Sequence, residues 1–242
     1  MLQKKIKINN DVFADLHTHI LPEMDDGAES VNDAIKLLRE EERQGITHVA
    51  LTPHFHLAKE EIEQFLLRRQ RSYEILCSKI VETGMAKDLK LLLGAEVRYD
   101  SNLAHIDCRK LCIANSSYLL LEPPGNYPFD FEQTVYGLLV QGITPIIAHI
   151  ERYPFLYEKT SLMEEFLDDG ILFHANAGSL FSRHYGSTVK KLAKKGYISF
   201  LASDTHNLDV RPPMLEDALR KLKKHAPEFV ANSAGVVNNI SF

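Results

Sequence analysis

Short apolar runs alternate along the chain with longer amphipathic stretches. Runs rich in Ile, Leu and Val predict strands that are buried on both faces, as in a parallel sheet. Each of the seven runs ends on a polar residue, namely His17, His54, Glu96, Glu122, His149, Asn176 and Asp204. Consecutive run ends lie 26 to 42 residues apart, a spacing that fits one βα unit for each run.

The amphipathic stretches predict helices between and after these runs. The clearest one, at 30–44, has Ser30 as a candidate N-cap, Asp33 as its acidic partner and Gly45 as a stop. The other predicted helices are 60–82, 131–141, 162–169, 188–195 and 214–224. After residue 224 we expect a polar tail that is too short for another βα unit.

This succession predicts an α/β fold with a distorted TIM-like (β/α)7 barrel, in a single domain that spans residues 1–242. The alternative is an open, doubly wound sheet. In that architecture the site lies at a topological switch point, where only two or three strand ends meet. Because all seven predicted ends carry a polar residue, the pattern favours a closed barrel. The lack of an eighth unit predicts that the barrel is incomplete or distorted.

Composition narrows the classes of function. The chain has 242 residues, of which 45% are hydrophobic and 25% charged, and its net charge is −5, so we expect a globular protein without a positive field for nucleic acid. Its basic start lacks the apolar core of a signal peptide, and we expect no membrane insertion. Three cysteines without a CxxC pair fit a reducing cytoplasm. Composition leaves the oligomeric state open.

The segment Asp15-Leu16-His17-Thr18-His19 is the sharpest local motif. Residues two apart on a strand face the same side, so His17 and His19 can bind one cation, with Asp15 orienting one of the rings. An isolated HxH segment is as often structural. Likewise, the following Asp25 and Asp26, before a glycine, could form a plain solvated turn.

The other strand ends favour a metal site. Asp204 and His206 repeat the spacing of an acid and an imidazole two positions apart. Glu96 and Glu122 each end an apolar run, where a carboxylate is costly unless positive charge compensates it. A cluster of divalent cations compensates several such acids and also uses the imidazoles. Nitrogen and oxygen ligands without thiolates favour Mn²⁺, Fe²⁺, Zn²⁺ or Mg²⁺.

Four further residues lie near these strand ends in the sequence. For His56 and His174 we expect a structural or ring-orienting role rather than metal ligation. Asn176 and Ser179 belong to the segment NAGSL. They could hold a substrate oxygen, but helix capping is the more common role for such residues, and we expect it here.

In their order along the chain, these motifs resemble the polymerase and histidinol phosphatase (PHP) superfamily. Within it they are similar to the CpsB/YwqE-type bacterial tyrosine-protein phosphatases of capsule or exopolysaccharide operons. The resemblance covers residues 13–215 and rests on the following segments: DLHTHILPEMDDGAES, TPHF, GAEVR, LLLEPP, AHIERY, NAGSL and SDTHNLDVRPP. DxHxH alone marks many metal hydrolases, whereas LPxxDDG, HxERY and SDxHNxxxRPP are much more specific.

The resemblance implies a distorted (β/α)7 barrel that carries three metals, most commonly with Mn²⁺-dependent activity. By motif, the ligands of the first metal would be His17, His19, Glu96 and Asp204. Glu96 would bridge to a second metal that is also held by Glu122 and His149, and the third would be held by Asp26, His54 and His206. Arg152 and Arg211 resemble the arginines that contact phosphate. Glu23 stands where glycine is common, but no departure removes a ligand.

The resemblance implies hydrolysis of phosphotyrosine by a metal-activated water, on the tail of a bacterial tyrosine kinase. Because a phenol leaves with a pKa near 10, a weak acid suffices, and Asp25, His206 or a water remain open as proton donors. A cysteine-based route needs Cys-x5-Arg. The residues six positions after Cys77, Cys108 and Cys112 are Thr83, Ala114 and Tyr118.

Three rival functions remain at this point. A small-molecule phosphatase, such as a histidinol-phosphate phosphatase, would share the metal site but need a closed pocket. A non-catalytic, metal-stabilised binding module would not need the two arginines. A polymerase-associated nuclease domain would need a basic stripe for a DNA backbone, which the acidic balance of the chain disfavours.

Overall fold

The computed structural model describes residues 13–114 and 116–241. The predicted domain 1–242 and the absence of a signal peptide at the start of the chain involve residues 1–12, which lie outside the described residues. None of the helices in the described ranges is both long enough and apolar enough to cross a bilayer.

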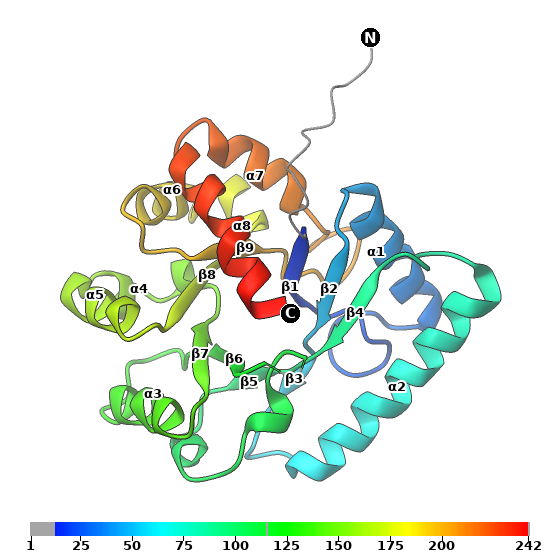
Figure 1. Cartoon of the computed structure of the whole chain (residues 1–242), viewed down its shortest axis with the longest axis horizontal. Coiled ribbons are helices and arrows are strands. Elements are labelled where there is room, and N and C mark those ends of the chain that lie inside the picture. Colours follow the sequence, from blue (N-terminus) through cyan, green and yellow to red (C-terminus); the bar gives the residue numbers. More distant parts are fainter. Residues whose placement is uncertain (1–12, 115, 242) are drawn as a thin grey trace.

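The strands of the described residues all pair in parallel. They are β1 (Ala14–Thr18), β2 (His48–Leu51), β3 (His54–Phe55), β4 (Lys90–Leu93), β5 (Glu96–Arg98), β6 (Tyr118–Glu122), β7 (Thr144–Ile147), β8 (Leu172–Asn176) and β9 (Phe200–Ala202). One sheet has the order β1-β2-β4, and the other has the order β3-β5-β6-β7-β8-β9. Figure 1 shows the strands curling around a common centre.

Two breaks, at residues 52–53 and 94–95, and one junction explain this arrangement. Only Thr52 and Pro53 separate β2 from β3, and proline has no N–H to donate to a ladder. Across the gap between β9 and β1, the backbone N–H of His19 donates to the carbonyl of Thr205 at 2.8 Å, and Thr18 and Thr205 form a parallel bridge. The strands therefore curl until the last one meets the first, which brings their carboxyl ends together.

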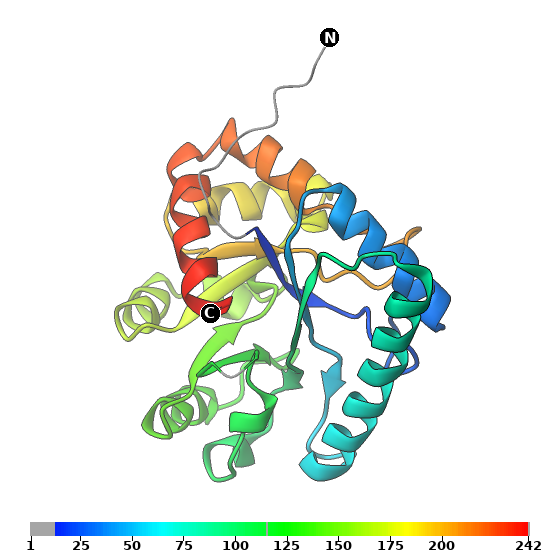
Figure 2. The same cartoon turned by 45° about the vertical axis from the view of Figure 1, so that its right-hand side comes forward.

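Helices form an outer layer around the strands (Figures 1 and 2). They are α1 (Val31–Arg43), α2 (Ile62–Thr83), α3 (Phe131–Val140), α4 (Pro154–Tyr157), α5 (Thr160–Asp168), α6 (Gly186–Lys194), α7 (Leu215–Lys223) and α8 (Pro227–Ser241), with 3₁₀ turns η1 (Ser101–Ala104), η2 (Arg109–Leu111), η3 (Ile150–Arg152) and η4 (Gly178–Phe181). The predicted cap of α1 is confirmed, since the Ser30 hydroxyl accepts from the backbone N–H of Asp33 at 3.2 Å.

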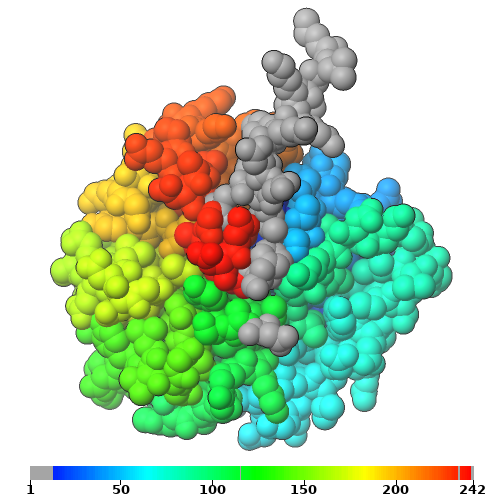
Figure 3. Space-filling view, in the orientation of Figure 1, coloured from blue at the N-terminus to red at the C-terminus, as the bar shows by residue number. Residues whose placement is uncertain are grey.

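The end of the chain differs from the prediction. The residues after 224 form helix α8 rather than a polar tail, and Phe229 and Ile240 are buried on it. Ile240 packs in one apolar cluster with Leu16, Phe200 and other residues that fill the space between the strands. In Figure 3 the red atoms of α8 lie over the middle of the face in view. Helix α8 therefore covers the amino ends of the strands, and the carboxyl ends remain for the site.

Candidate metal centre

Four buried side chains from three segments of the chain converge at the carboxyl side of the sheet. His17 and His19 come from the end of β1, Glu96 begins β5, and Asp204 follows β9. One ligand atom from each lies within 4.8 Å of the others. His17 Nε2 lies 3.1 Å from His19 Nε2 and 3.2 Å from Glu96 Oε2. His19 Nε2 lies 3.1 Å from Glu96 Oε2 and 3.4 Å from Asp204 Oδ1.

The hydrogen bonds of His17 show which ring nitrogen faces the cluster with a lone pair. The backbone N–H of His149 can only donate, and it lies 3.4 Å from His174 Nε2, which must therefore accept. His17 Nδ1 lies 3.0 Å from the same nitrogen and is then the donor. In a neutral imidazole only one nitrogen carries hydrogen. His17 therefore turns a bare Nε2 toward Glu96 and Asp204.

The same reasoning applies to His19. Its Nδ1 donates to Asp25 Oδ2 at 2.7 Å, because a carboxylate accepts only, so Nε2 is the nitrogen that faces the cluster. Although burial opposes it, Asp25, Asp204 and Glu96 raise the pKa of His19 well above its usual value, so this nitrogen attracts positive charge, either a proton or a metal ion. Two imidazole nitrogens and two carboxylate oxygens thus face one another in a buried space. Such a set is repulsive unless a cation lies among its members. The residues present fit a divalent metal with nitrogen and oxygen ligands.

The ionisation of Glu96 and Asp204 also supports a cation site in this inner group. Burial alone would raise the pKa of Glu96, but His17 and His149 beside it hold that pKa well below its usual value. Asp204 behaves similarly, since neighbouring His17 and His19 outweigh burial and lower its pKa far below the ordinary range. Both acids are therefore ionised at neutral pH, and they require positive charge at this point.

A second group lies nearer to solvent, where Asp26, His54 and His206 approach His19. Asp26 Oδ1 is 3.4 Å from His54 Nε2 and 3.3 Å from His206 Nε2. His206 Nδ1 donates to the carbonyl of Asp204 at 2.9 Å, which leaves a buried Nε2 without a hydrogen-bond partner. Burial and the adjacent His19 lower the pKa of His206 to about 4, so its ring is neutral and able to bind a metal.

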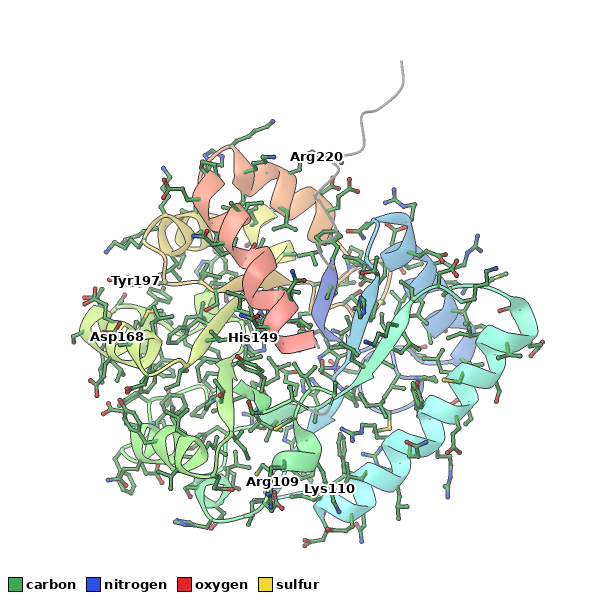
Figure 4. The ribbon with its side chains drawn as sticks, in the orientation of Figure 1. Arg109, Lys110, His149, Asp168, Tyr197 and Arg220 are labelled. Carbon is green, nitrogen blue, oxygen red and sulfur yellow. The ribbon has the colours of Figure 1, made fainter. Side chains whose placement is uncertain are left out.

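Glu96 joins these groups to a third one, which consists of His54, Glu96 and Glu122. The Nε2 atom of His149 lies 2.7 Å from Glu96 Oε1. Glu122 Oε2 also lies 3.3 Å from Arg98 Nη1, at the edge of the site. His149 lies among the strands near their common centre (Figure 4). Glu96 therefore contacts imidazoles on several sides, as a bridging carboxylate requires.

Two of these residues have a backbone conformation that is uncommon outside glycine. His149 has φ of 34° and Asp204 has φ of 54°, both in the left-handed region. Each lies two residues after the end of a strand, β7 for His149 and β9 for Asp204. Left-handed residues other than glycine concentrate at functional sites, where the surrounding structure holds them in place.

The loop after β1 brings Asp25 into hydrogen-bond contact with the His19 ring. Gly27 makes this approach feasible, because a Cβ there would lie 2.0 Å from the carbonyl oxygen of His19. Asp25 Oδ1 accepts from the N–H of Gly27 at 2.9 Å, and Oδ2 accepts from the N–H of His54 at 2.8 Å as well as from His19. Glu23, where glycine is common, has φ of 59°. The sequence departure thus falls at a left-handed position.

These contacts favour a different role for Asp25 from the expected proton donor. Although burial opposes it, the charge of His19 holds the pKa of Asp25 well below its usual value, so this carboxyl has no proton to give at neutral pH. Its bond to His19 Nδ1 is instead the contact that orients a metal-binding imidazole. We therefore regard Asp25 as a positioning residue.

Asp25→Asn is expected to weaken Mn²⁺ binding by about 10- to 100-fold, the usual effect of removing such an orienting group. Both carboxylate oxygens accept hydrogen bonds, so the amide NH₂ of asparagine must face a donor. Isothermal titration calorimetry with Mn²⁺ measures the loss. Asp107→Asn, at an exposed residue paired with Arg109, serves as the control. Equal affinities of the Asp25 variant and wild type would contradict this role.

Asp15 does not orient a histidine ring as expected. Its carboxylate accepts from the backbone N–H of His17 at 3.2 Å and from that of Ser203 at 3.0 Å. The reason is its burial between two strand ends, whose amides it reaches before any imidazole. Asp15 therefore ties β1 to the segment after β9.

The two predicted arginines both reach this cluster. Arg152 Nη2 lies 3.0 Å from Asp204 Oδ2, and Arg211 Nη2 lies 2.7 Å from Asp26 Oδ2. About a third of each side chain is exposed, 34% for Arg152 and 35% for Arg211. The guanidinium groups therefore flank the opening of the cluster, with donors left over for a ligand that enters from solvent.

Sequence reasoning misjudged Asn176 and missed Glu151. Asn176 Nδ2 donates to Asp204 Oδ2 at 2.6 Å, so Asn176 holds a cluster acid instead of capping η4, whose N-cap is Ala177 without a side-chain bond. Glu151 is buried and accepts from the N–H of Asn176 at 3.2 Å, and burial raises its pKa. The signal for Asn176 was its place at a strand end. No sequence signal marked Glu151, apart from its position two residues after His149.

His174 takes the orienting role that the sequence suggested, through its bond to His17. Burial, together with the nearby His17 and His149, lowers the pKa of His174 well below its usual value, so this ring is neutral. The ring of His56 lies 6.0 Å from that of His54, and His56 belongs to none of the candidate metal groups found among the described residues.

Comparison with known proteins places this cluster in a family. Residues 13–240 match the family described as "Capsular polysaccharide synthesis, CpsB/CapC". CapC of Staphylococcus aureus is 34% identical over 242 residues, which cover 94% of this chain and 92% of CapC. Tyrosine-protein phosphatase YwqE of Bacillus subtilis is 31% identical over 220 residues, covering 87% of this chain and 84% of YwqE.

A solved structure agrees with the sequence matches. It comes from a study of YwqE from Bacillus subtilis and CpsB from Streptococcus pneumoniae, described as unique metal-dependent tyrosine phosphatases. It superposes with a TM-score of 0.81 at 27% identity, over 95% of this chain and 96% of the other. With the motifs, the clustered ligands and these matches in agreement, the chain belongs to the CpsB/CapC family of capsular polysaccharide synthesis.

Proposed function

We propose that the chain is a metal-dependent protein-tyrosine phosphatase that hydrolyses phosphotyrosine by attack of a metal-activated water. Its substrate would be the phosphotyrosine tail of a bacterial tyrosine kinase of capsule or exopolysaccharide synthesis, in the cytoplasm. One observation carries the proposal. Buried ring nitrogens of His17 and His19 face the ionised Glu96 and Asp204 at the carboxyl side of the sheet, beside two arginines that are partly open to solvent.

We assign three divalent ions, Mn²⁺ in preference to Fe²⁺, Zn²⁺ or Mg²⁺, to this cluster. The first would be held by His17, His19, Glu96 and Asp204, the second by Glu96, Glu122 and His149, and the third by Asp26, His54 and His206. The distances among the first and third sets support this division. For the second set, His54 lies as close to Glu96 and Glu122 as a ligand would, and His149 contacts Glu96 from the other side.

When bound, such ions supply positive charge for the phosphoryl oxygens and lower the pKa of a water. Arg152 and Arg211 would bind the phosphoryl oxygens with planar pairs of donors, which stabilise the charge that spreads over these oxygens in the transition state. Asp25, His174 and Asn176 would hold His19, His17 and Asp204 in place. A phenolate leaving group has a conjugate-acid pKa near 10 and needs little protonation, for which a water is sufficient.

We further propose that the fold is a distorted (β/α)7 barrel of the PHP type, with seven strand positions around the barrel. On this view β2 and β3 are the two halves of one interrupted barrel strand, and β4 and β5 are the two halves of the next. The supporting contacts are the parallel pairings β2–β4 and β3–β5 together with the backbone junction between β9 and β1. Such a barrel brings every strand end to one opening, where the proposed ligands lie.

Replacement of Cys77, Cys108 and Cys112 together by serine should leave phosphatase turnover within about twofold of wild type. Cys108 and Cys112 are buried, and burial raises the pKa of each thiol to about 12, so neither supplies a thiolate at neutral pH. Steady-state kinetics checks this, with circular dichroism to show that the variant is folded. Loss of turnover in a folded triple variant would reopen a thiol mechanism.

The proposed substrate class is tested by comparing turnover of a phosphotyrosyl peptide, the matched phosphoseryl peptide and histidinol phosphate. We expect the Mn²⁺-loaded protein to hydrolyse the phosphotyrosyl peptide at least about tenfold faster than either competitor, because the phenol is the better leaving group. Preference for histidinol phosphate would support the small-molecule alternative. Metal binding without turnover of any of the three would support the non-catalytic one.

A further inference from the structure

A basic groove lies outside the metal cluster, between η4, α6 and α7. It has a volume of about 690 Å³, and its lining contains six of the chain's 28 Lys and Arg residues and no acidic residue. The six are Arg183, Lys190, Lys191, Lys194, Lys195 and Lys221. Helices α6 and α7 lie near each other in both cartoons (Figures 1 and 2).

The positive charge of the groove is not neutralised from within the protein. Across residues 13–114 and 116–241, none of the six cations forms an ion pair with a carboxylate, whereas Arg220 on the same helix α7 pairs with both Glu216 and Asp217. Lys221 is fixed in place instead. Its Nζ donates to the carbonyl of Leu180 at 3.1 Å and lies 4.2 Å from the centre of the Phe181 ring. The groove therefore presents positive charge that is free to pair with an external anion.

The groove begins next to the metal cluster. Turn η4 follows β8 almost directly, and the last residue of β8, Asn176, donates to the cluster acid Asp204. Leu180 and Phe181 of η4 line the groove. A 3₁₀ turn of this length spans roughly 8 Å, helix α6 places Lys194 roughly 12 Å beyond Gly186, and an extended peptide advances about 3.3 Å per residue. A chain with one residue in the cluster thus reaches the groove about three to six residues further on.

We infer that this groove binds an acidic stretch of the protein substrate, about three to six residues from its phosphotyrosine. This inference rests on the proposed phosphatase function for the link to phosphotyrosine, though not for the binding of acidic peptide. The groove would add affinity and choice of substrate without touching the reacting phosphate.

The surroundings of the groove favour a short peptide over larger polyanions. The whole chain carries 33 acidic against 28 basic residues, so the groove is a local positive surface on an acidic protein. A membrane or a nucleic acid extends over a wide area and would meet the net negative charge of the rest of the protein. Phe181 is also a poor platform for stacking a nucleobase, because the ammonium group of Lys221 lies over its ring.

The test compares phosphotyrosyl peptides of equal length in pairs, one with four Glu and the other with four Gln. These residues lie three to six positions from the phosphotyrosine, on its amino side in one pair and on its carboxyl side in the other. We expect the Mn²⁺-loaded wild type to favour a Glu peptide by at least about tenfold in kcat/KM at low salt, and the preference to vanish in 0.5 M NaCl. Lys190→Gln/Lys194→Gln should lose most of the preference while keeping wild-type turnover of p-nitrophenyl phosphate.

The matched control is Lys223→Gln/Lys224→Gln, which removes the same charge from exposed positions beside the groove. It should keep the preference for Glu. Equal losses in both double variants, or equal turnover of Glu and Gln peptides by wild type, would overturn the inference. A membrane partner would be indicated if wild type binds phosphatidylglycerol vesicles, the groove variant does not, and wild type shows no preference between the peptides. That result would also overturn the inference.

A binding measurement separates the groove from catalysis. A fluorescein-labelled peptide of six glutamates without phosphate should bind wild type in fluorescence anisotropy, and should bind Lys190→Gln/Lys194→Gln at least about fivefold more weakly. If this binding is seen but no phosphotyrosyl peptide is hydrolysed, the proposed phosphatase function fails and the groove stands. If peptides are hydrolysed but the glutamate peptide does not bind, the groove inference fails alone.

Discussion

Exhaustive chelation is expected to abolish phosphatase activity, with a fall on the order of 10³-fold or more, and Mn²⁺ should restore it best. The reason lies in the inner group, where His17 Nε2 and His19 Nε2 face Glu96 Oε2 at 3.2 and 3.1 Å. Without metal ions, the ionised carboxylates of Glu96 and Asp204 repel a phosphate dianion. Turnover of a phosphotyrosyl peptide, with metal content followed by elemental analysis, measures the effect.

Glu96→Gln provides the matching variant, because this carboxylate contacts His17, His19, His54 and His149 at once. This substitution should lower both the metal content and the turnover. It should also reduce the rise in Tm that added Mn²⁺ produces. Glu23→Gln makes the same chemical change at an exposed residue of the neighbouring loop and should have little effect. Full activity of protein shown to be free of metal would rule out the metal mechanism.

Arg152→Ala and Arg211→Ala are each expected to reduce kcat/KM by about 30- to 900-fold, on the order of 2–4 kcal/mol, while metal content stays unchanged. Both guanidinium groups already lie at the opening, at 3.0 Å from Asp204 and 2.7 Å from Asp26. A phosphoryl group in the cluster would compete with these carboxylates for the same donors, and the contact would strengthen as charge spreads over its oxygens.

Substitution by lysine should rescue each arginine only in part, because an ammonium group cannot reproduce the planar pair of donors. Arg220→Ala, at an exposed ion pair on the outer surface of α7, is the control and should change kinetics by less than about twofold (Figure 4). If instead the two arginines only pair with neighbouring acids, alanine will alter stability slightly and kinetics hardly at all. Near-wild-type kcat/KM for both alanine variants would exclude the assignment.

Much of the candidate site was predictable because its residues sit where apolar runs end. A run of Ile, Leu and Val identifies a buried parallel strand, and such strands end at one edge. The polar residues that follow, such as His17, Glu96 and Asp204, must then meet there. The hydrogen-bonded cap at Ser30 was equally predictable, since it depends on two residues three apart.

Roles that depend on contacts between distant segments were not predictable in the same way. The period-two rule placed Asp15 on the side of His17 and His19, but its carboxylate reaches the backbone amide of Ser203, which lies 188 residues away. Asp25 was an open candidate for proton donation until its contacts with His19 and His54 were known. Helix α8 was taken for a polar tail, although Val236, Val237 and Ile240 are apolar and pack against residues of the strands.

The sequence by itself determined the parallel α/β class, the alternation of strands and helices, and the set of nitrogen and oxygen ligands at the strand ends. These features follow from local periodicity and residue chemistry, which the chain carries wherever it folds. The tertiary structure alone decided which lone pairs face one another, which residues hold the ligands, and that lysines of α6 and α7 share one groove. Such features depend on how the curled sheet brings distant segments together, and no local pattern encodes that geometry.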